Sequence, residues 1–246
     1  MIPLFQETSI LLNTIKYFSG LERNTHIEIF YITTQKEGSQ QNNATLNLLL
    51  QHKLEKNIIH YPYYVGDKSH QLNYAFQEIY KKIRKNDLTD AYFAIFDADS
   101  RPELEVFDYI LNDVSSEMIY QLLSIYSTNY DTVSSINQAN SILQTRRTFS
   151  FEFPKLLSNF THQKGTSLMY LIGHGLIIRG DIRKKFPFPE NTLAEDIAYG
   201  YKMNIQNIFA KPLPFYDYCS VPYNYFHNLC QTARRFQGEL GLYKEV

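Results

Sequence analysis

The sequence contains no tryptophan, only two cysteines and almost no net charge. Cys219 and Cys230 are too few for a disulfide scaffold, so a reducing compartment is the expected environment. Neither cysteine has a Cys or His pair at the spacing typical of a zinc site, and we therefore interpret both as structural. The formal net charge of −1 offers no electrostatic basis for nucleic acid as a partner.

Long apolar runs are also missing from the sequence. No stretch approaches the ~18 apolar residues that a membrane-spanning helix needs, and we expect no signal peptide. We therefore expect a soluble, cytoplasmic protein, and leave open a peripheral attachment to the inner face of a membrane.

Aromatic residues, by contrast, are abundant. They make up 15% of the chain, which excludes a disordered polypeptide. Helical and strand-like segments alternate over the first half, and this pattern predicts one α/β domain with a mostly parallel central sheet flanked by helices. The predicted strands are 27–33, 58–63 and one that begins at Tyr92, and the predicted helices are 8–19 (with Thr8 as N-cap), 45–53, 70–85 and 103–112.

The second half of the sequence is less regular. Residues 134–158 are predicted to be helical in part, and 171–178 to form an apolar strand that is interrupted by Gly173-His174-Gly175. Glycines inside a strand often mark a place where backbone or a ligand approaches closely. Thr192-Leu193-Ala194-Glu195-Asp196 is expected to open a helix that runs to about Met203. A last strand is expected over 208–211 and a final helix over 224–241.

Asp97 and Asp99 follow the apolar run Phe93-Ala-Ile-Phe96, which is typical of a strand buried on both faces. The pair therefore sits at the carboxyl end of a strand, where open α/β sheets bind their ligands. Two carboxylates this close repel each other unless a cation or hydrogen-bond donors lie between them. A divalent metal that carries a phosphorylated substrate explains the pair, and a turn stabilised by aspartate at the strand end is the alternative.

Glu195 and Asp196 form a second acidic pair, at the start of a predicted helix. A carboxylate can accept the proton of a hydroxyl group, which makes Asp196 a candidate general base with Glu195 beside it. Acids in the first turn are also favoured by the helix dipole alone. Gln231 and Arg234 lie three residues apart on one face of the final helix, where they contact either a ligand or solvent.

Several stretches, in order and along nearly the whole chain, resemble the family 2 glycosyltransferases. They are similar, in turn, to the opening Pro-x-x-Asn/Gln-Glu, the Lys-x-x-x-Leu-Asn segment, the metal-binding Asp-x-Asp, the glycine-rich strand with its Glu-Asp pair, and the Gln-x-x-Arg-Trp signature. The matching segments here are Pro3 to Glu7, Lys68 with Leu72-Asn73, Asp97 to Asp99, Gly173 to Asp196, and Gln231 to Arg234 with Gly238. Two features depart from the family: Arg235, followed by Phe236, replaces the Trp, and few apolar residues precede Pro3.

The resemblance implies the GT-A fold, which is Rossmann-like, and the transfer of a sugar from a nucleoside-diphosphate sugar to a hydroxyl acceptor with inversion. It also implies Mg²⁺ or Mn²⁺ as cofactor, a UDP-sugar as the commonest donor, and a glycan or lipid-linked glycan as acceptor in polysaccharide or glycoconjugate synthesis. By resemblance, residues 1–112 would bind the donor and residues 113–246 the acceptor. The implied site residues are Asp97 and Asp99 for the metal, Asp196 and Glu195 for catalysis, and Pro3, Glu7, Lys68, Asp97, Gln231 and Arg234 for the nucleotide sugar.

Other interpretations stay open. A non-catalytic module that binds a sugar nucleotide or glycan would keep the fold; Arg235 in place of Trp favours it, and the retained Asp196 opposes it. A phosphohydrolase usually carries its Asp-x-Asp on the first strand, and a nucleotidyltransferase has a glycine-rich loop near its N-terminus, so both rank lower. His174 either contacts the acceptor or packs in the core, and Arg146 and Arg147 either bind an anionic acceptor or are solvated.

Overall fold

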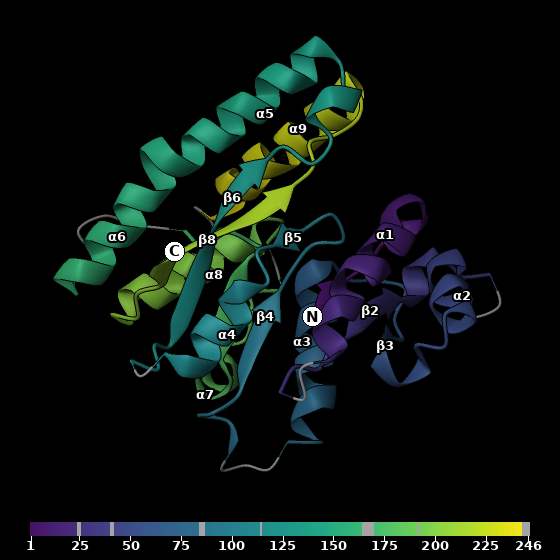
Figure 1. Cartoon of the computed structure of the whole chain (residues 1–246), viewed down its shortest axis with the longest axis horizontal. Helices are drawn as coiled ribbons and strands as arrows, with labels where there is room; N and C mark the ends of the chain where they lie inside the picture. The colour runs from purple at the N-terminus through teal and green to yellow at the C-terminus, as the bar shows by residue number, and fades with distance from the viewer. Residues whose placement is uncertain are drawn as a thin grey trace.

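The first part of the chain forms a parallel sheet connected by helices (Figure 1). The structure is a computed structural model and describes residues 1–23, 26–39, 42–83, 87–113, 115–163, 170–190 and 192–242, without the side chains of 22, 23, 234, 235 and 239–242. The strands have the order β1-β2-β3 and all pair in parallel. The elements are β1 (Ile2–Pro3), α1 (Thr8–Phe18), η1 (Ser19–Arg23), β2 (Tyr31–Thr34), η2 (Gln35–Glu37), α2 (Ala44–Gln51), η3 (Glu55–Asn57), β3 (Ile58–Tyr61) and α3 (Lys68–Tyr80).

The second part forms a mixed sheet with the strand order β4-β7-β6-β8-β5. β7 pairs antiparallel with both β4 and β6, whereas β6 and β8 are parallel. The strands are β4 (Tyr92–Ile95), β5 (Arg101–Pro102), β6 (Ile119–Tyr126), β7 (Leu176–Arg179) and β8 (Lys211–Cys219). The helices are α4 (Glu105–Asn112), η5 (Tyr130–Thr132), α5 (Ser135–Arg147), the π-helical turn η6 (Thr148–Glu152), α6 (Phe153–His162), α7 (Gly180–Lys185), α8 (Glu195–Ile205) and α9 (Tyr225–Leu242).

Hydrogen bonds from Met1 join the two sheets. The Met1 amino group donates to the Ala94 carbonyl (2.7 Å), and the Phe96 amide donates to the Met1 carbonyl (3.1 Å). This alternation is the pattern of a parallel ladder, so β1 and β4 lie side by side. The strands therefore continue as one central sheet, and the predicted α/β fold with a mostly parallel sheet is confirmed.

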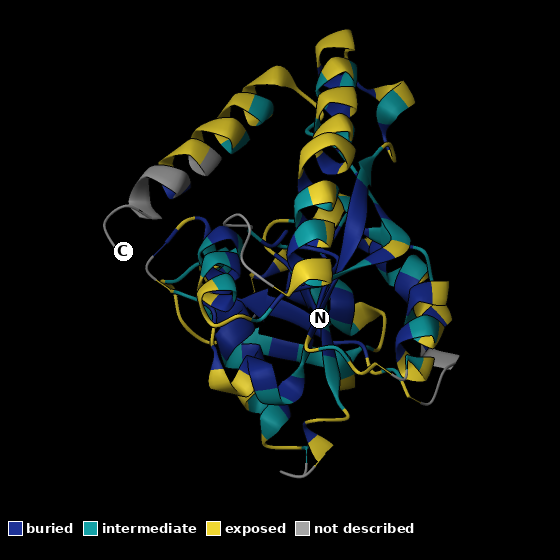
Figure 2. Cartoon of the chain, turned by 90° about the vertical axis from the view of Figure 1, so that its left-hand side faces the viewer, coloured by how far each residue is buried: buried dark blue, intermediate teal, exposed yellow. Residues whose placement is uncertain are grey.

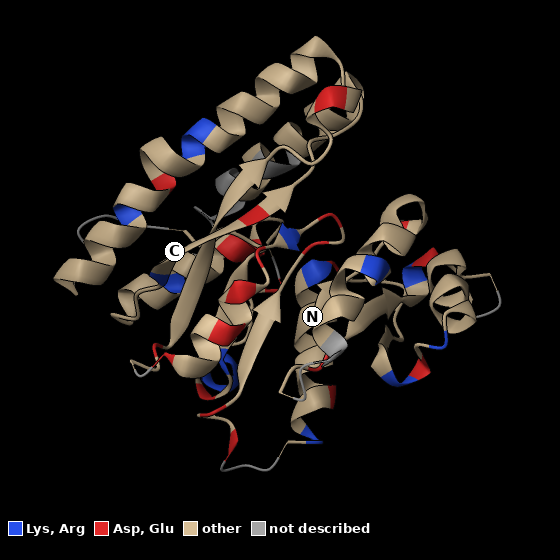
Figure 3. Cartoon of the chain, viewed as in Figure 1, with Lys and Arg blue, Asp and Glu red and all other residues tan. Residues whose placement is uncertain are grey.

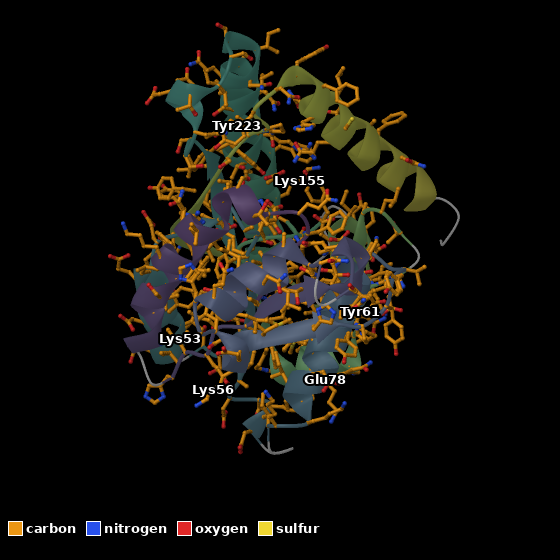
Figure 4. All side chains as sticks on the ribbon, turned by 90° about the vertical axis from the view of Figure 1, so that its right-hand side faces the viewer. Lys53, Lys56, Tyr61, Glu78, Lys155 and Tyr223 are labelled. Carbon is orange, nitrogen blue, oxygen red and sulfur yellow. The ribbon has the colours of Figure 1, made fainter. Side chains whose placement is uncertain are left out.

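Helices cover both faces of this sheet because its strands are apolar on both sides. Successive residues of β4 alternate between two cores: Phe93 and Ile95 pack with α3 and α8, whereas Tyr92 and Ala94 pack with α1 and α4. In Figure 2 the strands are dark blue and the outer surfaces of the helices are largely yellow. In Figure 4 Tyr61 lies at the end of β3 beside α3, while Tyr223 lies in the upper part of the view, before α9.

The predicted helices occur, but one predicted cap is wrong. α1 begins at Thr8, yet the N-cap position is Glu7, and no side chain accepts a capping hydrogen bond there. α3 starts two residues earlier than predicted, because Asp67 caps it: the Asp67 side chain accepts hydrogen bonds from the Ser69 and His70 amides, in a capping box. This cap fixes Lys68 in the first turn of α3.

The strands of the second half differ from the prediction. The last strand is β8, so the predicted strand over 208–211 is wrong; Pro212 and Pro214 fall inside β8 and obscure its pattern. β6 is a buried strand that we did not predict. The predicted strand 171–178 is confirmed only from Leu176 onward, because the Gly173-His174-Gly175 segment leaves the sheet. No helix within the described ranges combines the length and apolar character that crossing a bilayer requires.

Candidate active site

The Asp97–Asp99 turn follows β4 and lies between the two halves of the sheet. In Figure 3 the loop from β4 towards β5 is marked in red by its acidic residues. Each carboxylate has a partner far away in the sequence: Asp97 Oδ1 pairs with Lys68 Nζ, and Asp99 Oδ2 accepts from the Ser220 amide at 2.9 Å. Burial, and then Asp97, raise the pKa of Asp99. The turn therefore presents carboxylate oxygens whose mutual repulsion is only partly offset.

Glu7 adds a third carboxyl group on this side of the sheet. Burial, followed by the charges of Asp99 and Asp97, raises the pKa of Glu7 to about 7. Pro3, at the end of β1, pairs with Ile32 of β2 and leads the chain towards Glu7. A cluster of acids that raise one another's pKa values is the electrostatic environment that a divalent cation relieves.

Lys68 bridges the turn to the opposite wall of the site. Its Nζ contacts Asp97 Oδ1 and donates to the Gly173 carbonyl at 2.9 Å. Burial alone would lower the pKa of Lys68, but Asp97 and Glu195 outweigh it and raise that pKa. Lys68 is therefore a fixed positive charge between the two acidic pairs.

Gly173 brings the second acidic pair to the same place. Its amide donates to Asp196 Oδ2 at 3.0 Å, while Asp196 Oδ1 accepts from the Ile197 amide at 2.9 Å. A Cβ atom at Gly173 would lie 3.0 Å from Asp196 Oδ2, so this glycine permits the close approach. The expectation that the glycines of this segment mark such an approach is confirmed.

Glu195 is the first residue of α8 and faces Lys68 across the site. Burial, followed by the neighbouring charge of Asp196, raises the pKa of Glu195 to about 7. The N-terminal segment of α8 is held by α9, where a Cβ atom at Gly238 would lie 2.7 Å from the Ala194 Cβ. This close packing brings α9 against the residue that precedes the acidic pair.

One cavity of about 170 Å³ connects these groups. Of the predicted site residues, it is lined by Lys68, Asp97, Glu195, Asp196 and Gln231. Asp99 and Glu7 do not line it, although their charges act on the same cluster. Pro3 lies outside it as well, and the side chain of Arg234 falls outside the described part of the chain.

The opposite wall of the cavity includes Glu152 and Tyr170, to which the sequence assigned no role, and Arg147, for which it left two interpretations open. Arg147 at the end of α5 pairs with Glu152 (Nε to Oε1, 3.2 Å), and Tyr170 donates to the same Oε1 at 2.8 Å. The π-helical turn η6 follows Arg147 directly and ends at Glu152, and single π turns are often found at functional sites. Arg146 and Arg147 are exposed, as one of the two open interpretations predicted, yet Arg147 also reaches the cavity. No residue pattern in the sequence signals a π turn.

The comparisons with known proteins agree with this architecture. By sequence, the chain matches no protein-family model and no curated protein. Among solved structures it is similar to the mannosyltransferase PcManGT from Pyrobaculum calidifontis in complex with GDP-Man and Mn²⁺, with a TM-score of 0.58 and 13% identity. It is also similar to S. aureus TarS 1-349 in complex with UDP-GlcNAc, with a TM-score of 0.51 and 14% identity. The chain has the GT-A glycosyltransferase fold.

The similarity covers most of this chain but less than two thirds of PcManGT and of TarS. It covers 96% of this chain and 60% of PcManGT, and 88% of this chain and 57% of TarS. Mannosyl-3-phosphoglycerate synthase from Rubrobacter xylanophilus is similar at a TM-score of 0.50 and 14% identity, over 97% of this chain and 73% of that chain. At these identities, the similarity concerns the GT-A fold alone.

Proposed function

We propose that this protein is a metal-dependent glycosyltransferase of the family 2 type, which moves a sugar from a nucleoside-diphosphate sugar to a hydroxyl acceptor with inversion. The observation that carries the proposal is the shared cavity, in which Asp97 and Lys68 lie opposite Glu195 and Asp196. Glycosyl transfer needs charge neutralisation at the leaving diphosphate and a base at the attacking hydroxyl, held together in one place. Asp97, with Asp99 beside it in the same turn, and the pair Glu195 and Asp196 supply groups suited to both tasks.

The residues around Asp97 and Asp99 fit a hard divalent cation. Their donors are carboxylate oxygens, which suit Mg²⁺ and Mn²⁺. Glu7 increases the excess of negative charge there, as its raised pKa indicates. When bound, such a cation stabilises the charge that develops on the diphosphate. Lys68 adds a second positive charge, which belongs to the protein itself. Its contacts with Asp97 and with the Gly173 carbonyl hold this charge in place.

We assign the base to Asp196, with Glu195 as its neighbour. Backbone amides of Gly173 and Ile197 hold both Asp196 oxygens, so the carboxylate keeps one orientation at the cavity wall. In the proposed reaction the acceptor hydroxyl gives its proton to Asp196 as its oxygen forms a bond to the anomeric carbon. The bond from that carbon to the diphosphate oxygen breaks, and its electron pair leaves with the diphosphate. A single displacement of this kind inverts the configuration.

The donor half of the site would come from residues 1–112 and the acceptor half from residues 113–246. A UDP-sugar is the proposed donor, and a GDP-sugar is the second choice, because the complexes with similar folds contain UDP-GlcNAc and GDP-Man. Pro3, Glu7, Gln231 and Arg234 are proposed to contact the donor. The acceptor is proposed to be a glycan or lipid-linked glycan, in polysaccharide or glycoconjugate synthesis. The two free cysteines suit a reducing compartment, so we propose a cytoplasmic location.

A donor panel tests the proposal directly. The melting temperature of the protein is measured with UDP- and GDP-sugars, with and without Mn²⁺. A true donor at a hundredfold excess over its Kd stabilises the folded state by about 2.7 kcal/mol. We expect one donor class to stabilise the protein only with Mn²⁺, and Asp99→Asn to abolish the effect while the surface control Asp131→Asn keeps it. The absence of a metal-dependent shift for every donor would contradict the proposal, and a shift without any turnover would favour a binding module.

A further inference from the structure

A second cluster of potential metal ligands lies beside the Asp97–Asp99 turn. His174, Asp217 and Cys219 are all buried, and one donor atom of each lies within 4.8 Å of the others. His174 Nδ1 is 2.9 Å from Asp217 Oδ2 and 3.5 Å from Cys219 Sγ. His174 comes from the glycine-rich segment before β7, whereas Asp217 and Cys219 come from β8. His174 is more than 40 residues from the other two along the sequence, so no local motif indicates the cluster. For this reason neither cysteine was expected to bind zinc.

The Asp217 carboxylate is incompletely satisfied for a buried charge. It is fully buried, and its Oδ2 accepts a hydrogen bond from Ser100 Oγ at 2.9 Å and faces His174. Its Oδ1 is buried and has no hydrogen-bond partner among the described residues. A buried carboxylate oxygen without a partner is costly, and a cation bound by the Asp217 carboxylate would offset that cost.

The thiol of Cys219 supplies a sulfur donor to the cluster, 3.5 Å from His174 Nδ1. A cysteine that binds no metal carries its thiol proton at neutral pH. A coordinated cation removes that proton, because a thiol that binds a metal is deprotonated outright. The resulting thiolate and the Asp217 carboxylate together balance a charge of +2, with His174 as a neutral ligand.

The donor atoms suit zinc, and one of the distances between them matches a zinc site directly. Sulfur, imidazole nitrogen and carboxylate oxygen are zinc ligands, whereas Mg²⁺ and Mn²⁺ prefer oxygen alone. Tetrahedral zinc with ordinary bond lengths places its sulfur and nitrogen ligands about 3.5 Å apart. The Sγ–Nδ1 distance in the structure is 3.5 Å, so these two ligands need no rearrangement. His174 also lines the cavity, which gives an ion a path to the cluster.

We propose that His174, Asp217 and Cys219 form a zinc site, separate from the metal site proposed at Asp97 and Asp99. Binding of Zn²⁺ releases the thiol proton of Cys219 and any proton on His174 Nδ1 to solvent, and no electron is transferred. The site would tie β8 to the glycine-rich segment that carries Gly173. The inference goes beyond glycosyl transfer and does not depend on it.

Cobalt spectroscopy on the metal-stripped protein tests the site without any nucleotide sugar. Co²⁺ substitutes for Zn²⁺, and a thiolate ligand gives a charge-transfer band in the near ultraviolet. The chain has only two cysteines, so in Cys230→Ser the only thiol left is Cys219. Cys230 is exposed on α9, which makes this variant a mild change.

We expect a thiolate band whose intensity corresponds to one thiolate-bound Co²⁺ per chain in wild type and in Cys230→Ser, and loss of the band when Zn²⁺ is added. Cys219→Ser should lack the band. No band in folded Cys230→Ser would overturn the proposal, even if Cys219→Ser failed to fold. A band that persists in Cys219→Ser would also overturn it. Because no sugar donor takes part, a negative result here leaves the proposed glycosyl transfer untouched.

Discussion

At the scale of single residues, Gly173 is the point where the two acidic pairs meet. Its carbonyl accepts from Lys68, and its amide donates to Asp196, so one peptide segment positions both groups. Both bonds use backbone atoms, and a side chain at this position would crowd the site, because a Cβ atom would lie 3.0 Å from Asp196 Oδ2. The site therefore depends on backbone placement as much as on its charged side chains.

Gly173→Ala should impair the reaction without unfolding the protein. The added methyl group displaces the Asp196 carboxylate, and a misplacement of about 1 Å can cost about a hundredfold in rate. We expect release of nucleoside diphosphate to fall by about ten- to a hundredfold. The matched control is Gly20→Ala, where a Cβ atom would meet nothing within 4 Å. Equal rates in the two variants would refute this role of Gly173.

Glu195 should make stability depend on pH. Its folded-state pKa of about 7 exceeds the ordinary value of 4.5 because of burial and Asp196, so its contribution to stability is present below pH 4.5 and is lost as the pH rises through 7. Each pKa unit corresponds to about 1.4 kcal/mol of stability, and partial exposure of the side chain reduces the total. We therefore expect the free energy of unfolding to fall by about 2 kcal/mol as Glu195 ionises.

The measurement compares melting temperatures of wild type and Glu195→Gln at pH 5 and pH 8.5. The variant should be the more stable protein at pH 8.5, because a neutral amide does not lose stability by ionising. The difference in melting temperature between the variant and wild type should be smaller at pH 5 than at pH 8.5. A wild type that matches or exceeds the variant at pH 8.5 would show that the Glu195 carboxylate is not destabilised.

At the scale of elements, α3 organises the site from its start and from its middle. Asp67 caps its start and positions Lys68, while Asn73 in its middle anchors the loop that leads to α8. The Asn73 side chain donates to the Phe188 carbonyl at 2.9 Å and accepts from the Phe188 amide at 3.1 Å. The motif residue Asn73 is therefore structural, since it holds the segment that precedes Glu195.

Asn73→Ala should destabilise the protein. The substitution leaves the buried amide and carbonyl of Phe188 without their partner, and each such group costs about 1–3 kcal/mol. A loss of about 2 kcal/mol lowers the melting temperature of a domain of this size by about 4–8 °C. The measurement is thermal unfolding of Asn73→Ala and of the control Gln77→Ala, which replaces an exposed residue on the same helix. A melting temperature shared by both variants would contradict the anchoring role.

The sequence predicts what depends on local pattern and misses what depends on distant strands. The alternation of apolar runs predicts α1 to α4 and the strands β2, β3 and β4. The position of Asp97 and Asp99 directly after the apolar run of β4 predicts that they lie at the end of that strand. β8 was misplaced because Pro212 and Pro214 interrupt its apolar pattern. The π turn before Glu152 and the meeting of His174 with β8 arise only from tertiary packing, which no local pattern records.

At the scale of the whole molecule, the sheet brings residues far apart in the chain to one cavity. β1 and β4 place Glu7 and Asp97 on one side, and the segment before β7 places Gly173 opposite them. Apolar cores on both faces of the sheet hold these strands in register. The cavity therefore combines elements from both halves of the chain, as the proposed transfer between two substrates would require.

The most direct measurement compares donor binding with donor turnover in Asp196→Asn. In the proposed mechanism Asp196 takes the proton of the acceptor hydroxyl and does not hold the donor. We predict that the variant keeps the Mn²⁺-dependent stabilisation by the sugar nucleotide, while acceptor-dependent release of nucleoside diphosphate falls by at least about a hundredfold. Release at the wild-type rate in a folded Asp196→Asn protein would show that this carboxylate is not the base.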